Sequence, residues 1–197
     1  MITTRSLGLI VILCFQFITT RSQSDTSFST QQALLFADSL VKANYYQNWN
    51  VYESLSCPSA IKYYGGKDGF REHIMEVYYR NEPKVEEKPE TVKMVTIMYD
   101  NIEQWQCVIE KIRDAYMEDS RKAKVYTYLV GQSLDNGKTW KFIDVSHNNI
   151  ENVIYIMPDI FTSLAIPERK LVYDDQVVAE ENKMPRPPTK KKTTKKS

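Results

Sequence analysis

The feature that most constrains the fold is a change in hydrophobic period at Thr91. Before that residue, apolar side chains recur at helical spacing. After it, apolar and polar residues alternate along four successive segments, which is typical of β-strands. These segments are TVKMVTIMY, QWQCVIEKIRDAYME, AKVYTYLVGQS and KTWKFIDVS. Because helices and strands are segregated along the chain, the sequence predicts an α+β fold rather than a parallel α/β fold.

The helical half of the chain divides at its capping and breaking residues. A first helix is expected in STQQALLFADSLVKANYY, where Ser29 and Gln32 match a capping box. The helical spacing continues in NWNVYESLS, which predicts a second, shorter helix. This helix is expected to end before Pro58, because the residue preceding a proline disfavours helical backbone. The segment AIKYYGG is predicted to be a brief strand, KDGFREHIMEVYYRNEP the third helix, and NNIENVIYIMPDI a short closing helical turn.

The connections between the four later strands are short, which predicts an antiparallel meander. We expect a strongly bent sheet of four to six strands. The second of the four segments is longer than an ordinary strand, so a bulge or sharp bend is expected within it.

The N-terminal end has the pattern of an export signal. Arg5 precedes the apolar run LGLIVILCFQFI, and Thr20 and Ser22 are small residues at −3 and −1 of a cleavage site before Gln23. We interpret residues 1–22 as a signal peptide, which predicts a periplasmic or secreted protein. An uncleaved anchor is the alternative, although the run is shorter than the roughly 20 residues of a membrane span. No membrane span is expected in the mature chain.

The C-terminal end is rich in proline and lysine, and residues 167–197 are predicted to be a disordered extension. All 25 acidic residues lie between residues 23 and 182 with 17 of the 26 basic ones, so that part has a net charge of −8. A short linker, 23–29, and one α+β domain, 30–166, are expected there. The Lys-rich tail could bind anionic lipid, an acidic polymer or the chain's own acidic body, or only promote solubility. Nucleic acid is not expected as a partner, because the tail has no aromatic residue for stacking.

The octapeptide SLDNGKTW, Ser133 to Trp140, matches the Asp-box hairpin of sialidase-type β-propellers. Asn136-Gly137 favours the positive φ angles of a tight turn, and Asp135 can accept hydrogen bonds from the turn's own amides. A propeller needs several such hairpins at regular intervals, whereas this chain has one. The motif therefore predicts a hairpin turn and not a glycan-processing enzyme.

The order of elements resembles the nuclear transport factor 2-like superfamily, which includes ketosteroid isomerases and polyketide cyclases. The resemblance is carried by STQQALLFADSLVKANYYQNWN, by IKYYGGKDGFREHI, by the meander with its stretch GKTWKFID, and by the closing segment ending at Pro158. It covers residues 30–158 and implies a cone-shaped fold, in which a bent sheet wraps around the first helix and a pocket opens at the mouth. No catalytic motif of the family can be matched residue by residue.

Three functions follow as hypotheses. The leading one is an exported, non-catalytic binding or interaction module with a small-molecule pocket at the cone mouth. The alternative is a small isomerase or hydro-lyase of the ketosteroid-isomerase type, with Asp100 or Asp144 as the base. A further alternative is an oligomeric structural protein, such as a homodimer, that uses the sheet face as its interface.

Aromatic side chains on the predicted strands are the candidates for lining a pocket. One face of a bent sheet lines the cone, so aromatic walls with few polar groups suit an apolar or ring-bearing ligand. Packing in the core is the competing interpretation. The candidates are Tyr63, Tyr64, Trp105, Tyr126, Tyr128, Trp140 and Phe142.

After removal of a signal peptide two cysteines remain, Cys57 and Cys107. In an oxidising compartment they could form a disulfide, and two separately buried thiols are the alternative. The two histidines and the two cysteines have no spacing that predicts a zinc site. No cofactor is expected.

Overall fold

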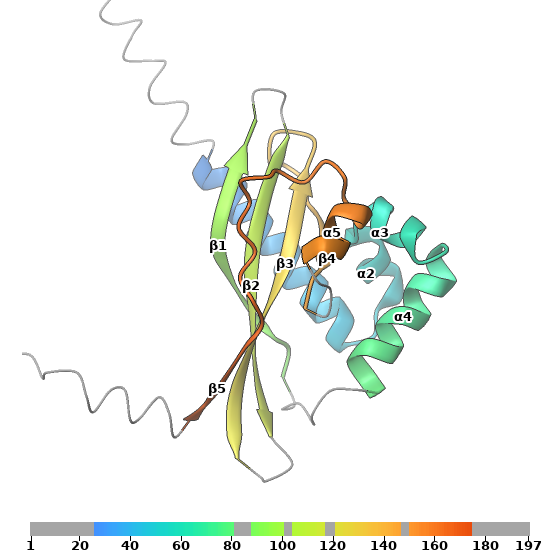
Figure 1. Ribbon diagram of the computed structural model, residues 1–197, viewed down its shortest axis with the longest axis vertical. Helices are drawn as coiled ribbons and strands as arrows, with labels where there is room; N and C mark the ends of the chain where they lie inside the picture. The colour runs from blue at the N-terminus through green and yellow to red at the C-terminus, as the bar shows by residue number, and fades with distance from the viewer. Residues whose placement is uncertain (1–25, 81–87, 101–103, 117–120, 147–149, 175–197) are drawn as a thin grey trace, which may run out of the picture.

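The computed structural model describes residues 26–80, 88–100, 104–116, 121–146 and 150–174. Helices pack against a strongly curled antiparallel sheet, which gives the cone-like α+β arrangement that the sequence predicts (Figure 1). The predicted signal peptide, residues 23–25 and the tail beyond residue 174 lie outside the described residues. No helix in the described ranges is long and apolar enough to cross a membrane.

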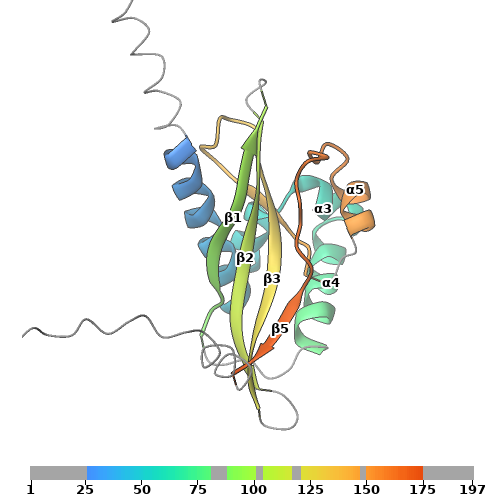
Figure 2. The same ribbon diagram turned by 60° about the vertical axis from the view of Figure 1, so that its left-hand side comes forward.

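The N-terminal helix covers residues 26–45 and lies along one side of the sheet (Figure 2). Its buried stripe contains Ala33, Ala37, Leu40 and Val41, the spacing expected of one helix face. Ser29 is not the N-cap that the sequence predicts, because the helix already includes residues 26–28. Ser29 is instead buried in the helix, and its hydroxyl donates to the carbonyl of Asn136 at 3.4 Å. Residues 26–29 are thus part of the folded unit rather than a linker.

Two short helices follow, α2 (Trp49–Leu55) and α3 (Pro58–Tyr63). The side chain of Asn48 caps α2 by accepting from the amide of Val51. The prediction of a strand in residues 60–66 was wrong: residues 60–63 belong to α3, with Pro58 in its first turn, where a proline costs no hydrogen bond. The strand-like contact lies just before it, where Ser56 forms a parallel bridge with Phe142.

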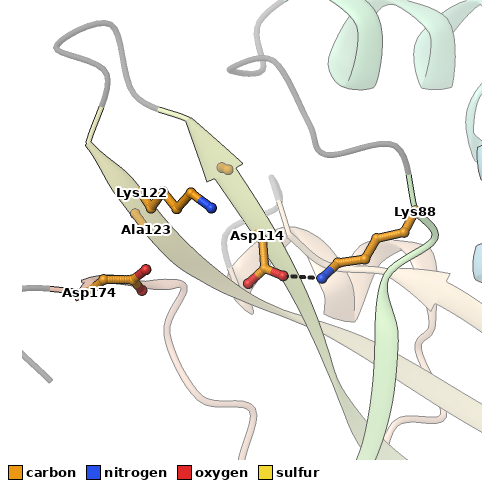
Figure 3. Close-up of a pocket in the computed structure, with 6 residues that line it drawn as sticks. Lys88, Asp114, Lys122, Ala123 and Asp174 are labelled. Carbon is orange, nitrogen blue, oxygen red and sulfur yellow. Dashed lines mark ion pairs between the residues drawn. The ribbon is translucent and has the colours of Figure 1, made fainter.

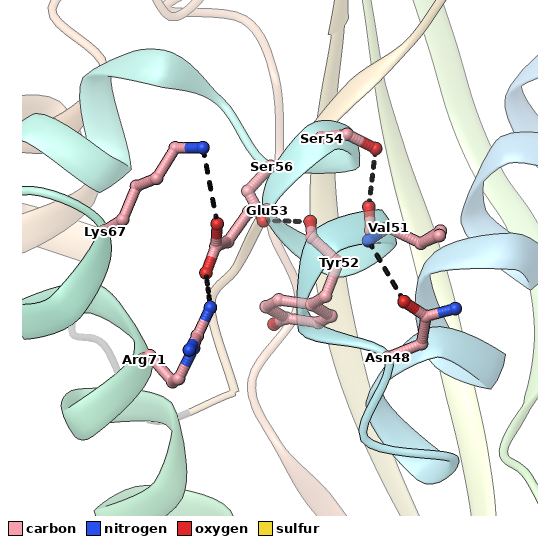
Figure 4. Close-up of polar contacts among 8 residues, drawn as sticks. All are labelled: Asn48, Val51, Tyr52, Glu53, Ser54, Ser56, Lys67 and Arg71. Atoms are coloured by element: carbon pink, nitrogen blue, oxygen red, sulfur yellow. Dashed lines mark hydrogen bonds and ion pairs between the residues drawn. The ribbon is translucent and has the colours of Figure 1, made fainter.

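Helix α4 (Lys67–Arg80) is fixed to α2 by a buried carboxylate. Glu53 of α2 is 6% exposed and accepts from Arg71 at 2.6 Å, and Lys67 lies 3.6 Å from its other oxygen (Figure 4). On the apolar side of α4, Phe70 and Ile74 are buried in the core. The ion pairs and the apolar stripe therefore hold α4 in one orientation against α2.

The sheet contains β1 (Thr91–Tyr99), β2 (Trp105–Tyr116), β3 (Lys122–Ser133) and β4 (Lys141–Asp144) in the predicted meander order. The pairing of β2 with β3 is regular over its whole length, from Trp105 opposite Ser133 to Tyr116 opposite Lys122. The irregularity expected in β2 lies instead in β1, between Met94 and Thr96. The long strand remains regular because β3 pairs with it at every residue.

One edge of β3 is shared by two strands. Near its C-terminal end β3 pairs with β4, and near its N-terminal end it pairs with β5 (Lys170–Tyr173). The sequence assigned residues 167–174 to a disordered extension, yet they return to the sheet and add a fifth strand. Sequence periodicity did not indicate β5, because it has only four residues and a charged flank.

The SLDNGKTW segment forms the turn that the sequence predicts. Asn136 and Gly137 have φ angles of 61° and 74°. The carboxylate of Asp135 accepts from the amides of Lys138 and Thr139 at 3.2 and 2.9 Å, and the indole of Trp140 donates to the carbonyl of Gly137 at 3.0 Å. The polar residues of the motif are thus used to close the hairpin.

Helix α5 (Ile150–Ile156) leads into a segment that crosses the other side of the sheet (Figures 1 and 2). Gln106 of β2, 0% exposed, donates to the carbonyl of Asp159 and accepts from the amide of Phe161, both at 2.8 Å. Gln132 donates to the Asp159 carboxylate at 2.6 Å. Residues 159–161 therefore cover this part of the sheet face.

Candidate functional site

The structure places the seven candidate aromatic residues in two environments. Four of them are at least nine-tenths buried in the core: Trp105, Tyr128, Trp140 and Phe142. Tyr64 and Tyr126 are half-buried, and Tyr63 is exposed. Tyr64 stacks on His73, with ring centroids 3.9 Å apart. The seven side chains are therefore not gathered around one opening.

The two candidate aspartates also lie apart. Asp100 follows β1, where its carboxylate accepts from the amide of Gln104 at 3.0 Å and closes the turn into β2. Asp144 ends β4 and accepts from Lys111 at 2.5 Å and from the amide of Ser146 at 2.9 Å. Asp100 therefore lies just after the pair of Tyr99 with Trp105, whereas Asp144 pairs with Leu129 of β3. The two candidate bases are at different places in the sheet.

Asp144 belongs to an ionic cluster that the sequence did not reveal. Lys111 of β2 is 1% exposed, and its ammonium lies 3.2 Å from Glu90 and 2.5 Å from Asp144. Burial lowers the pKa of Lys111, and Glu90 opposes this effect. Burial, with Arg169 nearby, also lowers the pKa of Arg113 to about 10. Two carboxylates thus compensate a lysine that has almost no access to water.

The two cysteines lie in the core as free thiols. Burial raises the pKa of both, that of Cys57 to about 12, so each thiol stays protonated and unreactive. Cys107 lies opposite Gly131 on β3. A Cβ on Gly131 would lie 2.7 Å from the Cys107 sulfur and 2.6 Å from the Phe142 ring, so only glycine fits between them.

A cavity opens at the other end of the same two strands, which we call the charged cavity (Figure 3). It has a volume of about 200 Å³ and is lined by Lys88, Asp114, Ala115, Lys122, Ala123 and Asp174. Ala115 and Ala123 are opposite each other in the β2–β3 pairing. Both alanines are buried, whereas Asp114 and Lys122, their neighbours along the strands, are half-buried and exposed and supply the charged walls.

The cavity brings together three separate parts of the chain. Lys88 precedes β1, Asp114 and Lys122 lie near the facing ends of β2 and β3, and Asp174 follows β5. In Figure 3, Asp114 and Asp174 lie on either side of Lys122. Because β5 pairs with β3 up to Tyr173 opposite Ala123, the pairing itself brings Asp174 to the cavity.

Charges of both signs face the cavity. Asp114 forms an ion pair with Lys88, and this hydrogen bond lowers the pKa of Asp114, with smaller contributions from Lys124 and Lys122. The ammonium of Lys122 lies 5.2 Å from the centre of the Tyr116 ring, which helps to hold that side chain over the strand end. Within the described part of the chain, no cation lies within ion-pair distance of Asp174.

Sequence reasoning missed this cavity for two reasons. Its acidic and basic residues are spread over residues 88–174 and have no motif spacing. Asp174 was assigned to the disordered extension. The one available signal was the alternation in KAKVYTY, where a small Ala123 stands between Lys122 and Lys124, across from Ala115.

In the described ranges, no group of three or more His, Cys, Asp or Glu side chains is placed to hold a metal ion. The architecture therefore defines a class only: an α+β domain with a curled antiparallel sheet and a small charged cavity at one end. Comparisons with protein-family models, with curated proteins and with solved structures found no match for this chain.

Proposed function

We propose that this protein is an exported, non-catalytic binding module of the nuclear transport factor 2-like kind. In this proposal it holds a small charged ligand in the charged cavity. The observation that carries the proposal is the cavity itself, a hollow of about 200 Å³ whose walls include Lys122 and Asp174, two side chains of opposite charge that form no ion pair with each other. Few, convergent polar groups around a hollow are typical of ligand sites.

The chemistry of the walls favours a polar ligand over the apolar, ring-bearing ligand suggested by the aromatic residues. None of those seven aromatic side chains lines this cavity, and four of them pack in the core. Lys122 and Asp174 instead offer one donor and one acceptor with formal charge. We therefore propose a small polar ligand in place of the apolar, ring-bearing one, in a protein that still acts as a binding module.

The contacts of the two candidate bases favour a structural role for them over a catalytic one. Asp144, the candidate base, is engaged by Lys111 and Ser146, and Asp100 closes a turn. A homodimer that used the sheet face would have to displace residues 159–161, which already satisfy Gln106. These contacts favour the binding module over the isomerase and the sheet-face oligomer.

The proposal is tested by thermal unfolding of the mature chain in the presence of a panel of small charged compounds. The panel contains amino acids, carboxylates, amines and inorganic phosphate. A ligand that binds only the folded state stabilises it, and the rise in Tm grows with the logarithm of the ligand concentration above Kd. We expect at least one compound to raise the Tm of the wild type but not that of Lys122→Ala, which removes a charged side chain from the cavity.

A second variant, Asp174→Ala, removes the facing carboxylate and guards against a folding defect in the first. A panel that leaves the wild-type Tm unchanged would contradict the proposal. So would a compound that stabilises the wild type and both variants equally, because its site would then lie elsewhere.

A further inference from the structure

We infer that the ligand of the charged cavity is a small zwitterion, with an ammonium group and an anionic group on neighbouring atoms, as in a free amino acid. This inference rests on the proposed function and specifies its ligand class. It follows from the arrangement of charges on the walls and from the size of the hollow.

The walls disfavour a ligand with a single charge. An anion placed beside Lys122 also faces the carboxylates of Asp114 and Asp174. A cation placed beside Asp174 also faces Lys122. In either case part of the attraction is cancelled by repulsion, which is how a site rejects the wrong partner. A ligand with both charges avoids the repulsion and satisfies both walls.

Asp174 and Lys122 are the residues assigned to the two ends of the ligand. The carboxylate of Asp114 is already compensated by Lys88, whereas Asp174 has no cation within ion-pair distance among the described residues. Asp174 therefore receives the ligand's ammonium group. Lys122, held over the Tyr116 ring, donates to the ligand's anionic group.

The size of the cavity sets the scale of the ligand. A volume of about 200 Å³ equals roughly seven water molecules at their share of liquid volume. An amino acid with a small side chain fits this space, whereas a sugar chain or a peptide segment does not. The charged side chains of Asp114, Lys122 and Asp174 line this space, so a compact ligand with charges at both ends suits it better than an apolar one.

The inference is tested with three probes of nearly equal size and different charge. L-Alanine has both charges, N-acetyl-L-alanine has only the carboxylate, and L-alaninamide has only the ammonium group. At about pH 6.5 the amines are protonated, since an α-amino group titrates near roughly 7.7–8.0. Their affinities for the mature chain are measured by chemical-shift titration of its backbone amides.

We expect L-alanine to bind about tenfold more tightly than either analogue, because each analogue loses one charge-assisted hydrogen bond. Asp174→Asn should remove the advantage of L-alanine over N-acetyl-L-alanine. Lys122→Gln should remove its advantage over L-alaninamide. The matched controls, Asp38→Asn and Lys138→Gln, change exposed charges away from the cavity and should leave all three affinities unchanged.

The outcomes separate the inference from the proposed function. An analogue that binds the wild type as tightly as L-alanine does, but binds Lys122→Ala or Asp174→Ala much more weakly, overturns the zwitterion while the cavity remains the binding site. Equal affinities of the wild type, Asp174→Asn and Lys122→Gln for L-alanine overturn the assigned contacts. If none of the three probes, and no compound of the panel, acts through the cavity, both the inference and the proposed function are wrong.

Discussion

The two ends of the β2–β3 pair are built in opposite ways. At one end, Gly131 lies between Cys107 and Phe142 with no room for even a methyl group, and the turn that follows closes on itself through hydrogen bonds. At the other end, the charged side chains of Asp114, Lys122 and Asp174 surround an open hollow. The same strand pair is filled where it supports the fold and hollow where we propose that it binds.

The difference shows that residue size alone does not tell how full a site is. At Gly131 a small residue goes with tight packing, because Cys107 and Phe142 occupy the space that a Cβ would need. At the charged cavity long side chains go with open space, because Lys88 and Lys122 are exposed and extend toward solvent.

The largest effect is expected between the two ends, at the ionic cluster. Asp144→Ala removes one of the two carboxylates that compensate the buried Lys111, and breaking such a pair costs about 3–5 kcal/mol. The free energy of unfolding is measured by urea denaturation. The double variant Lys111→Met with Asp144→Ala should lose less than the sum of its single variants, with a coupling of about 0.5–3 kcal/mol. Additive losses would contradict a compensated buried charge.

The next effect is expected at the filled end. Gly131→Ala places a Cβ 2.6 Å from the Phe142 ring, and overpacking of this kind costs about 1–3 kcal/mol. The matched change on the same strand is Lys122→Ala at the cavity end, which shortens an exposed side chain and should cost less than about 1 kcal/mol. Comparing the two unfolding curves checks the contrast directly. An equal loss at both positions would remove it.

A slightly smaller effect is expected at the turn. Gly137 has a φ of +74°, and an added Cβ would lie 2.2 Å from the hydroxyl of Ser29. Gly137→Ala should therefore cost about 1–2 kcal/mol, from the left-handed backbone and from the clash. Ser29→Gly in the same chain should recover only the part caused by the clash. Full recovery would show that the backbone angle costs nothing.

The smallest effect concerns the charges at the hollow end and depends on pH. The ion pair with Lys88 lowers the pKa of Asp114 in the folded chain below its unfolded value of about 3.9. The folded state then binds fewer protons, so this stabilisation is present above the unfolded pKa and is lost as pH falls through the folded one. Its size should be about 0.2–1 kcal/mol, as for other partly exposed ion pairs.

The variant Asp114→Asn isolates this contribution. The difference in unfolding free energy between the wild type and the variant should shrink as the pH falls below about 4. A difference that stays constant from neutral to acid pH would show that the carboxylate does not gain from Lys88.

Much of the fold could be predicted because it depends on local patterns. The period change at Thr91 predicted the meander, and Asn136-Gly137 predicted the turn with its positive φ angles. The same local patterns predicted the wrong structure where tertiary contacts determine the conformation. Residues 60–63 look like a strand yet belong to α3, and β5 is recruited by β3 although its sequence is short and charged.

The candidate site could be predicted much less well. The burial of Lys111 and the approach of Asp174 to Lys122 follow from strand pairing over long separations, which one sequence does not display. The aromatic strand residues were easy to find and mostly belong to the core. Side chains that would bind a ligand at strand ends look like ordinary surface charges until the strands are placed.

Binding of a ligand in the charged cavity is tested most directly by a map of backbone amide chemical shifts, recorded on adding the panel compound that raises Tm most. We expect the shifted amides to cluster around Ala115, Lys122 and Ala123 at the hollow end. The amide shifts of Gly131 and Gly137 at the filled end should not change. Shifts that cluster around the filled end, or around the buried aromatic residues Trp105 and Trp140, would contradict binding in the charged cavity.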